Sequence, residues 1–108
     1  MYSITREDLP LGVMALQSSH ALIDYVIKFP EESKEWNKSS NYLGQLVAKN
    51  EEELEMLMFK AEKKGIRFLP FYEPDLENKL TAIAFEATIL SKKLLSSYPL
   101  MFKNIQTV

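Results

Sequence analysis

The chain has 108 residues, of which 46% are hydrophobic and 26% are charged, with a formal net charge of −2 and no cysteine. This length and composition are typical of one globular domain and exclude a disordered chain. The lack of cysteine excludes disulfides and thiolate sites, and the single histidine excludes a metal site built from several imidazoles. The small negative charge argues against extensive phosphate contact but leaves room for a local basic patch.

The first part of the chain predicts a strand over residues 2–5, a loop through Gly12 and a helix over residues 13–27. Pro30 is expected to begin a short second helix that ends near Trp36. Apolar residues mark two sides of the long helix, which is therefore expected to be largely enclosed by the rest of the domain. One stripe consists of Val13, Leu16, His20, Ile23 and Ile27, and the other of Ala15, Leu22 and Val26.

The middle of the chain predicts a strand over residues 42–48 and a helix that begins after Asn50. Asn50 is expected to cap this helix together with Glu53, three residues later. Apolar residues follow at helical spacing, and Gly65 is expected to end the helix in a left-handed conformation. These apolar residues are Leu54, Leu57, Met58 and Ala61.

Two further strands are predicted over residues 66–72 and 80–87, joined by a polar loop over residues 73–78. Pro70 cannot donate a ladder hydrogen bond, so the first of these strands is expected at an edge or a bulge. Thr88 is expected to cap a last helix through about residue 96. This alternation predicts a single layered α/β domain over residues 1–108, with a mixed sheet if the last two strands pair antiparallel.

The segment Gln17-Ser18-Ser19-His20-Ala21 is the first candidate for chemistry. Imidazole is the side chain that ordinarily changes charge near neutral pH. The alternative is a packed histidine with one satisfied nitrogen. Ser19 and His20 are adjacent and do not face each other on a helix, so a triad from these neighbours is not supported.

The segment Arg6-Glu7-Asp8-Leu9 lies with Gly12 between a strand end and a helix start. Ligands of open α/β sheets bind in such places, and free amides at a helix N-terminus accept anions such as phosphate. The glycine, lysine and hydroxyl pattern of a P-loop is absent. The alternative is a surface turn with a salt bridge.

The acidic loop offers Glu73 and Asp75 just before a strand that carries Thr81. In the functional interpretation, Asp75 or Glu73 meets His20 or Arg6 across the end of the sheet, and Thr81 supplies a hydroxyl. The alternative is ordinary turn chemistry in solvent.

Basic residues gather near the end of the central helix, where Lys63 and Lys64 occupy its last turn. They are candidates for substrate binding. The alternative is compensation of the helix dipole on a solvated surface.

In their order and spacing, these segments resemble the type 2 peptidyl-tRNA hydrolase family from about residue 3 to residue 95. Arg6-Glu7-Asp8-Leu9 is similar to the family's Arg-x-Asp-Leu, and Gln17-Ser18-Ser19-His20-Ala21 to its Gln-Cys-Ser-His-Ala. Thr81-Ala82-Ile83-Ala84 is similar to its Thr-x-Ile-Ala. The acidic start of the helix at Asn50 and its Lys64-Gly65-Ile66 exit also look like the family.

The resemblance implies a four-stranded mixed sheet with helices on both faces, often in a homodimer. It implies cleavage of the ester between peptide and tRNA in the cytoplasm, with no metal or organic cofactor and with tRNA or peptidyl-tRNA as partner. The implied catalytic residues are His20, Asp75 and Thr81. The candidate substrate-binding residues are Arg6, Asp8, Gln17, Lys63 and Lys64.

The chain departs from the family where that family carries lysines ahead of its histidine, because the loop here reads Pro10-Leu11-Gly12-Val13-Met14. Pro74 stands where the family has arginine, and Thr88-Ile89-Leu90-Ser91 replaces its glycine-rich turn. A rival hypothesis is therefore a non-catalytic dimeric binding module that retains the fold. Its interface is expected to use Tyr98, Leu100, Met101 and Phe102. No signal peptide or membrane span is visible, so a cytoplasmic location is expected.

Overall fold

A computed structural model describes residues 1–103 of the chain and shows an α/β domain built on one four-stranded sheet. Its strand order is β2-β1-β4-β3, with β1 and β2 parallel and the two pairs that contain β4 antiparallel. The predicted mixed sheet is therefore confirmed. The elements are β1 (Tyr2–Arg6), α1 (Leu11–Lys28), α2 (Pro30–Lys38), β2 (Gly44–Ala48), α3 (Glu51–Lys63), β3 (Phe68–Glu73), a 3-10 turn (Pro74–Leu76), β4 (Lys79–Phe85) and α4 (Ile89–Leu95).

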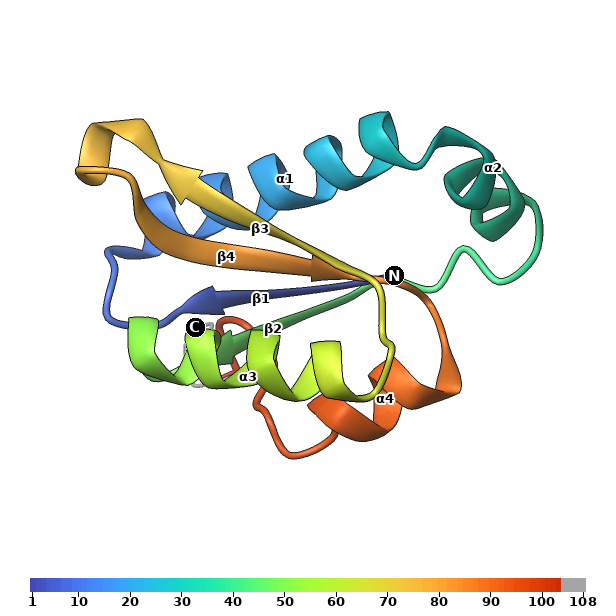
Figure 1. Ribbon diagram of the computed structural model, residues 1–108. Helices are drawn as coiled ribbons and strands as arrows, with labels where there is room; N and C mark the ends of the chain where they lie inside the picture. Colours follow the sequence, from blue (N-terminus) through green and yellow to red (C-terminus); the bar gives the residue numbers. More distant parts are fainter. Residues whose placement is uncertain (104–108) are drawn as a thin grey trace.

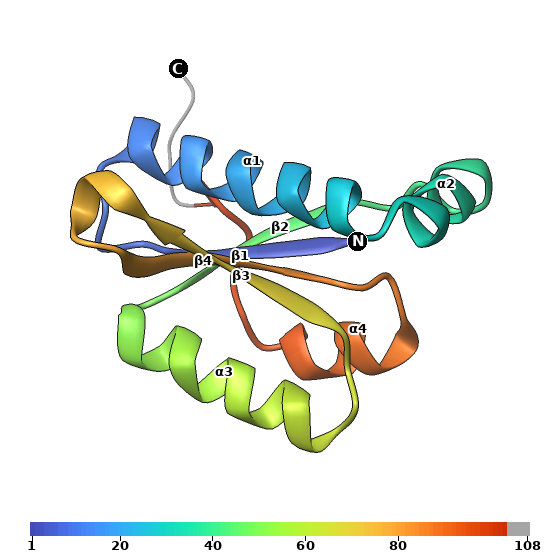
Figure 2. The same cartoon turned by 45° about the horizontal axis from the view of Figure 1, so that its top comes forward.

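Helices cover both faces of the sheet. Figure 1 shows α1 on one face and α3 with α4 on the other, and Figure 2 shows the same layers after a rotation. The helix α2 continues on the α1 side, beyond the end of the strands. Side chains that point to one face of the sheet therefore meet α1, and those that point to the other meet α3 and α4.

The predicted caps of the later helices are confirmed. The side chain of Asn50 accepts a hydrogen bond of 3.0 Å from the amide of Glu53 at the start of α3. After α3, Gly65 adopts a φ of +69°, which a residue with a side chain rarely adopts. Thr88 accepts a hydrogen bond of 3.2 Å from the amide of Ser91 at the start of α4. These bonds satisfy amides that a helix leaves free at its first turn.

The two edges of the sheet are protected differently. The edge strand β3 carries Pro70, as expected for a residue that cannot donate to a ladder. Along β2, the amide of Val47 donates to the carbonyl of Pro99 over 2.9 Å, and the amide of Met101 to that of Gln45 over 2.9 Å. The C-terminal segment that was predicted to form a dimer surface thus pairs with its own β2, while Leu100 in it remains exposed.

The prediction that α1 is largely enclosed is wrong. Leu16, Ile23 and Ile27 are 61%, 56% and 72% exposed. Because only one side of α1 rests on the sheet, a single face is covered, and that face is partly polar. The buried residues of α1 are Met14, Gln17, Ser18, Ala21 and Tyr25.

Candidate functional site

A layer of hydrogen-bonded polar side chains lies between α1 and the sheet. Ser3 of β1 and Ser18 of α1 are both fully buried, and their hydroxyls share a hydrogen bond of 2.6 Å. Gln45 of β2 donates to the Ser18 hydroxyl over 2.9 Å. Serine is a weak helix former because its hydroxyl competes for backbone bonds, and here that hydroxyl is used across the layer instead.

Gln17 is the central residue of this layer. The Thr81 hydroxyl donates to Gln17 Oε1 over 2.6 Å, and Gln17 Nε2 donates to Glu73 Oε1 over 2.9 Å. The amide of Gln17 is thus fixed by its acceptor at one end and by its donor at the other. The result is a continuous chain of hydrogen bonds from the buried strand β4 to a carboxylate at the rim of the sheet.

Thr81 reaches Gln17 because it is the extra residue of a β-bulge. Phe71 pairs with Ala82 and Tyr72 pairs with Leu80, so Thr81 has no register partner in β3. A bulge turns a side chain that strict alternation would send to the other face. Thr81 therefore points to the α1 side together with its neighbour Ala82, whereas strict alternation would place these two side chains on opposite faces.

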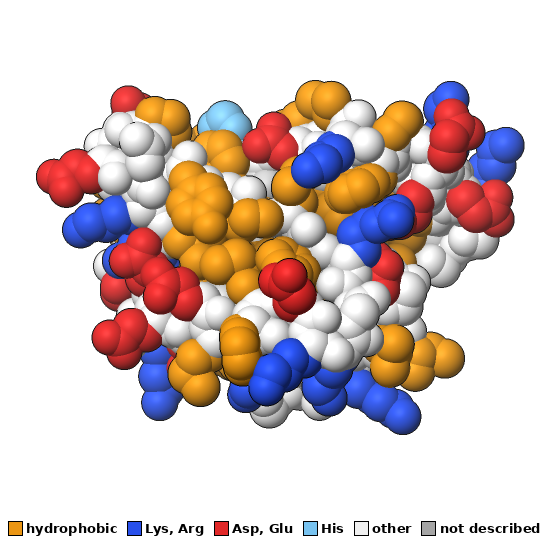
Figure 3. Space-filling model, in the orientation of Figure 1, with side chains coloured by type: hydrophobic (Ala, Val, Ile, Leu, Met, Phe, Trp, Pro, Cys, Tyr) orange, Lys and Arg blue, Asp and Glu red, His pale blue; other side chains and the backbone are white. Residues whose placement is uncertain are grey.

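His20 lies on the exposed side of α1, next to the end of this chain of bonds. Its ring stacks on Phe71 with centroids 4.8 Å apart and an interplanar angle of 1°. The imidazole is exposed although its ring packs on Phe71, and among the described residues no hydrogen bond satisfies a ring nitrogen as the alternative required. Figure 3 shows it, in pale blue, at the upper edge of the molecule with hydrophobic atoms beside it.

Glu73 is the carboxylate of this site. The hydrogen bond from Gln17 holds its pKa below the ordinary value, the bond from the Asp75 amide acts in the same direction, and the charge of His20 adds to the effect, whereas partial desolvation opposes it. A carboxylate that remains charged close to an exposed imidazole is the arrangement that stabilises an imidazolium. Asp75, which the resemblance pointed to, contributes its backbone amide to Glu73 over 3.4 Å. Within residues 1–103 the Asp75 carboxylate has no hydrogen bond or ion pair, whereas the Glu73 carboxylate accepts from Gln17.

Arg6 is held at a different place, on the α3 side of the sheet. Its Nε and Nη2 donate to the two oxygens of Asp8 over 2.9 and 3.0 Å, and its Nη1 donates to the carbonyl of Leu80 over 3.3 Å. The hydrogen bond from Arg6 lowers the pKa of Asp8, and the same bond raises that of Arg6. The amide of Leu80 is bound by Glu51 over 2.9 Å, so Arg6 and Glu51 together fix the start of β4. The predicted salt bridge is present, and it uses most of the guanidinium that was expected to hold a phosphate.

Lys63 and Lys64 do not join the site. They lie at the C-terminal end of α3, on the face of the sheet opposite α1 and at the opposite end of the strands from Arg6. The Lys63 ammonium is 4.5 Å from the ring centroid of Phe59, in a cation–π contact. The basic cluster therefore does not face His20.

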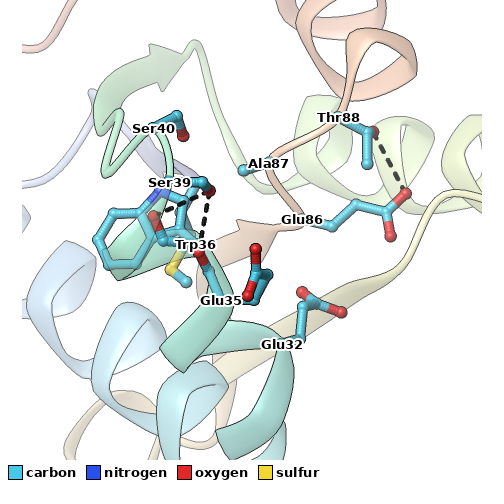
Figure 4. A pocket seen from close by; sticks show the side chains of 9 residues that line it. Glu32, Glu35, Trp36, Ser39, Ser40, Glu86, Ala87 and Thr88 are labelled. Atoms are coloured by element: carbon cyan, nitrogen blue, oxygen red, sulfur yellow. Dashed lines mark hydrogen bonds between the residues drawn. The ribbon is translucent and has the colours of Figure 1, made fainter.

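An acidic cavity of about 290 Å³ lies at the far end of the sheet, where β1 begins and β4 has ended. Figure 4 shows Glu32, Glu35 and Glu86 around it, with the indole of Trp36 on one wall. Glu32 is already held by Arg67 over 2.7 Å. None of the residues that the sequence analysis proposed for chemistry lines this cavity.

Thr81, Gln17 and Glu73 form one hydrogen-bonded group, and His20 lies beside it, stacked on Phe71 and without a hydrogen bond or ion pair to Glu73 among the described residues. Arg6 with Asp8 forms another, and the lysines of α3 lie apart. The sequence analysis named Gln17 only as a substrate-binding residue. It could not reveal the hydrogen bond from Thr81, because the bulge that turns Thr81 toward Gln17 leaves no local signal. In the part of the chain that the structure describes, no three acidic or histidine side chains are grouped to hold a metal ion, and no helix is long and apolar enough to cross a bilayer.

Comparison with models of known protein families and with curated proteins finds no match to this chain. The function is therefore argued from the geometry of the site and from the motif resemblance alone.

Proposed function

We propose that the chain hydrolyses an ester of the peptidyl-tRNA or aminoacyl class, with His20 as general base and Glu73 as its carboxylate partner. The observation that carries this proposal is an exposed imidazole stacked on Phe71 of β3, two residues from Glu73, a carboxylate that buried Gln17 holds in place. The order of motifs along the chain, similar to type 2 peptidyl-tRNA hydrolases, supports the same chemistry.

In the proposed reaction, His20 takes a proton from a water molecule whose oxygen bonds to the ester carbonyl carbon. The bond between that carbon and the alcohol oxygen breaks, and His20 returns the proton to the leaving oxygen. The products are a carboxylic acid and an alcohol, so atoms and charges balance. Glu73 stabilises the imidazolium that forms between the two proton transfers.

Thr81 acts in this proposal through Gln17 and not on the substrate. Its side chain is fully buried, and its hydroxyl proton is donated to Gln17. Because the Gln17 carbonyl accepts from Thr81, its NH₂ group is turned toward Glu73. Thr81 and Gln17 are thus positioning residues. The proposed reaction gives no role to Arg6, Asp8, Lys63 or Lys64.

The test is release of peptide from peptidyl-tRNA by the purified chain. We expect His20→Ala and Glu73→Gln to lower kcat by about 10²–10⁴-fold, the usual contribution of a positioned acid–base group. Asp75→Asn is the matched control in the same loop and should retain activity. Equal rates for the wild type and His20→Ala would reject the proposal.

A second candidate is a non-catalytic homodimeric module, and the exposed apolar residues of α1 favour it. Leu16, Ile23 and Ile27 lie on one side of that helix and are more than half exposed. Light scattering over a range of concentrations decides whether a dimer forms. If Leu16→Ser abolishes such a dimer while no peptide is released, this candidate replaces the hydrolase.

A further inference from the structure

Two exposed apolar side chains flank His20 along α1, and the exposed Asp24 stands one turn after it, beside Ile23. Leu16 lies one turn before His20 and Ile23 one turn after it, at the spacing that places side chains next to each other on a helix. Leu16 is 61% exposed and Ile23 56% exposed. Behind the imidazole stands the ring of Phe71. A molecule that approaches His20 along this side of α1 therefore contacts the side chains of Leu16, Ile23 and Phe71.

Positive charge is not in excess here. Lys79 is the register partner of Glu73, so one lysine stands opposite one carboxylate beside the site. The guanidinium of Arg6 is held by Asp8. In Figure 3, lysine and arginine side chains lie along the lower edge, over α3 and α4, and others lie at the left edge and the upper right of the view. A polyphosphate ligand gains its affinity from several cations, and this surface does not offer them.

We propose that Leu16 and Ile23 bind the acyl half of the substrate, so that the substrate class is an ester with an apolar acyl group and few phosphate contacts. This inference rests on the proposed hydrolase function and narrows its substrate.

Taken alone, the stripe is smaller than an interface between two copies of the chain requires. From Leu16 to Ile27 it runs eleven residues, about 16 Å of helix. Its exposed side chains amount to on the order of 300 Å² of accessible surface, the size of the largest apolar patch on an ordinary monomer, whereas a stable protein interface needs roughly 800 Å² from each partner. The stripe therefore matches one side chain or a short peptide.

The first experiment measures binding without catalysis. Adenosine amides of N-acetyl-glycine, N-acetyl-alanine and N-acetyl-leucine are titrated against the wild type, Leu16→Ser and Met56→Ser. Met56 is 58% exposed on α3, which makes it a matched control on the other face. We expect affinity to rise from glycine to leucine by up to about fourfold for each methylene removed from water. The rise should be lost in Leu16→Ser and retained in Met56→Ser.

The second experiment measures hydrolysis of the corresponding esters at several salt concentrations. We expect kcat/KM to follow the same acyl order and to change little with salt, in contrast to a ligand held through many phosphates. Binding preference without hydrolysis would support the acyl site and reject the proposed enzyme. Hydrolysis with equal rates for glycine and leucine esters and a steep salt dependence would reject the acyl site and leave the enzyme standing. If the wild type forms a dimer that Leu16→Ser abolishes, and no acyl preference is found, the acyl site is also rejected.

Discussion

The two faces of the sheet carry different kinds of buried side chain. Under α3, the sheet meets hydrocarbon, with Ile4, Ile83 and Phe85 packed against Leu54 and Leu57. Under α1, the same strands present small and polar side chains that bond to the helix. The polar set is Ser3, Thr5, Gln17, Ser18 and Thr81, all of them at most 3% exposed.

The two faces therefore have different roles: one stabilises the fold, and the other positions polar side chains. Burial of hydrocarbon is non-directional and roughly proportional to area, so the α3 face supplies free energy of folding. Hydrogen bonds between buried groups contribute little net free energy, but they fix atoms in direction and distance. The α1 face thus orders Gln17 and Glu73 at a cost in apolar burial, and the Thr5 hydroxyl has no hydrogen-bond partner in the described residues.

The largest effect is expected on the hydrocarbon face. Leu57→Ala removes a side chain that is 1% exposed and leaves a cavity. We expect the free energy of unfolding to fall by about 2–5 kcal/mol, measured by urea denaturation. Met56→Ala, its exposed neighbour on the same helix, should change the free energy little. A loss for Leu57→Ala that is no larger than this control would mean that α3 does not carry the core.

A smaller effect is expected from the centre of the polar layer. Gln17→Ala removes the acceptor of Thr81 and the donor to Glu73. A buried hydroxyl without a partner costs about 1–3 kcal/mol, so the free energy of unfolding should fall by about that amount. Ser19→Ala, on the exposed side of α1, is the control. An unchanged midpoint of urea denaturation for Gln17→Ala would show that the polar layer tolerates an unsatisfied group.

Thr5→Val gives the sharpest contrast within the layer, because it is expected to stabilise the protein. The Thr5 hydroxyl is buried without a partner, and valine has a similar shape and suits a strand. We expect a gain of up to about 1 kcal/mol from removing the unsatisfied group. Thr81→Val should have the opposite sign because its hydroxyl bonds to Gln17. Thermal denaturation of the two variants distinguishes them, and a lower Tm for both would contradict the assignment.

The smallest effect is expected on the pH dependence of folding stability in the acidic range. The folded-state pKa of Glu73 lies below its ordinary value of 4.5, mainly because of the bond from Gln17. The unfolded state therefore takes up the proton first, and the stability from Glu73, complete well above pH 4.5, is lost as pH falls through the folded pKa. Glu73→Gln should flatten the dependence of unfolding midpoint on pH in that acidic range. Asp75→Asn should leave the slope contributed by Glu73 in place, and equal flattening by both variants would assign it to the loop as a whole.

Much of the fold could be predicted from local sequence. The caps at Asn50 and Thr88 and the left-handed Gly65 depend on residues at most a few positions away, and all three are confirmed. Pro70 indicated an edge strand through its missing amide hydrogen, and β3 is at the edge. The burial of α1 could not be predicted in this way, since its hydrophobic pattern does not say how many sides a neighbouring layer covers.

The site shows the same limit more clearly. Sequence singled out His20, Thr81 and the acidic loop, but it chose Asp75 over Glu73. Gln17 and Glu73 are separated by 56 positions, and their bond exists only because β3 and α1 meet on one face.

Local sequence was enough to predict the α/β class, the helix caps and the residue types available for chemistry, because capping, backbone preference and periodicity act over a few residues. Which of those residues meet depends on how the elements pack. A single extra residue in β4 turns Thr81 from one face of the sheet to the other. That shift depends on the pairing of β3 with β4, so no local pattern records it.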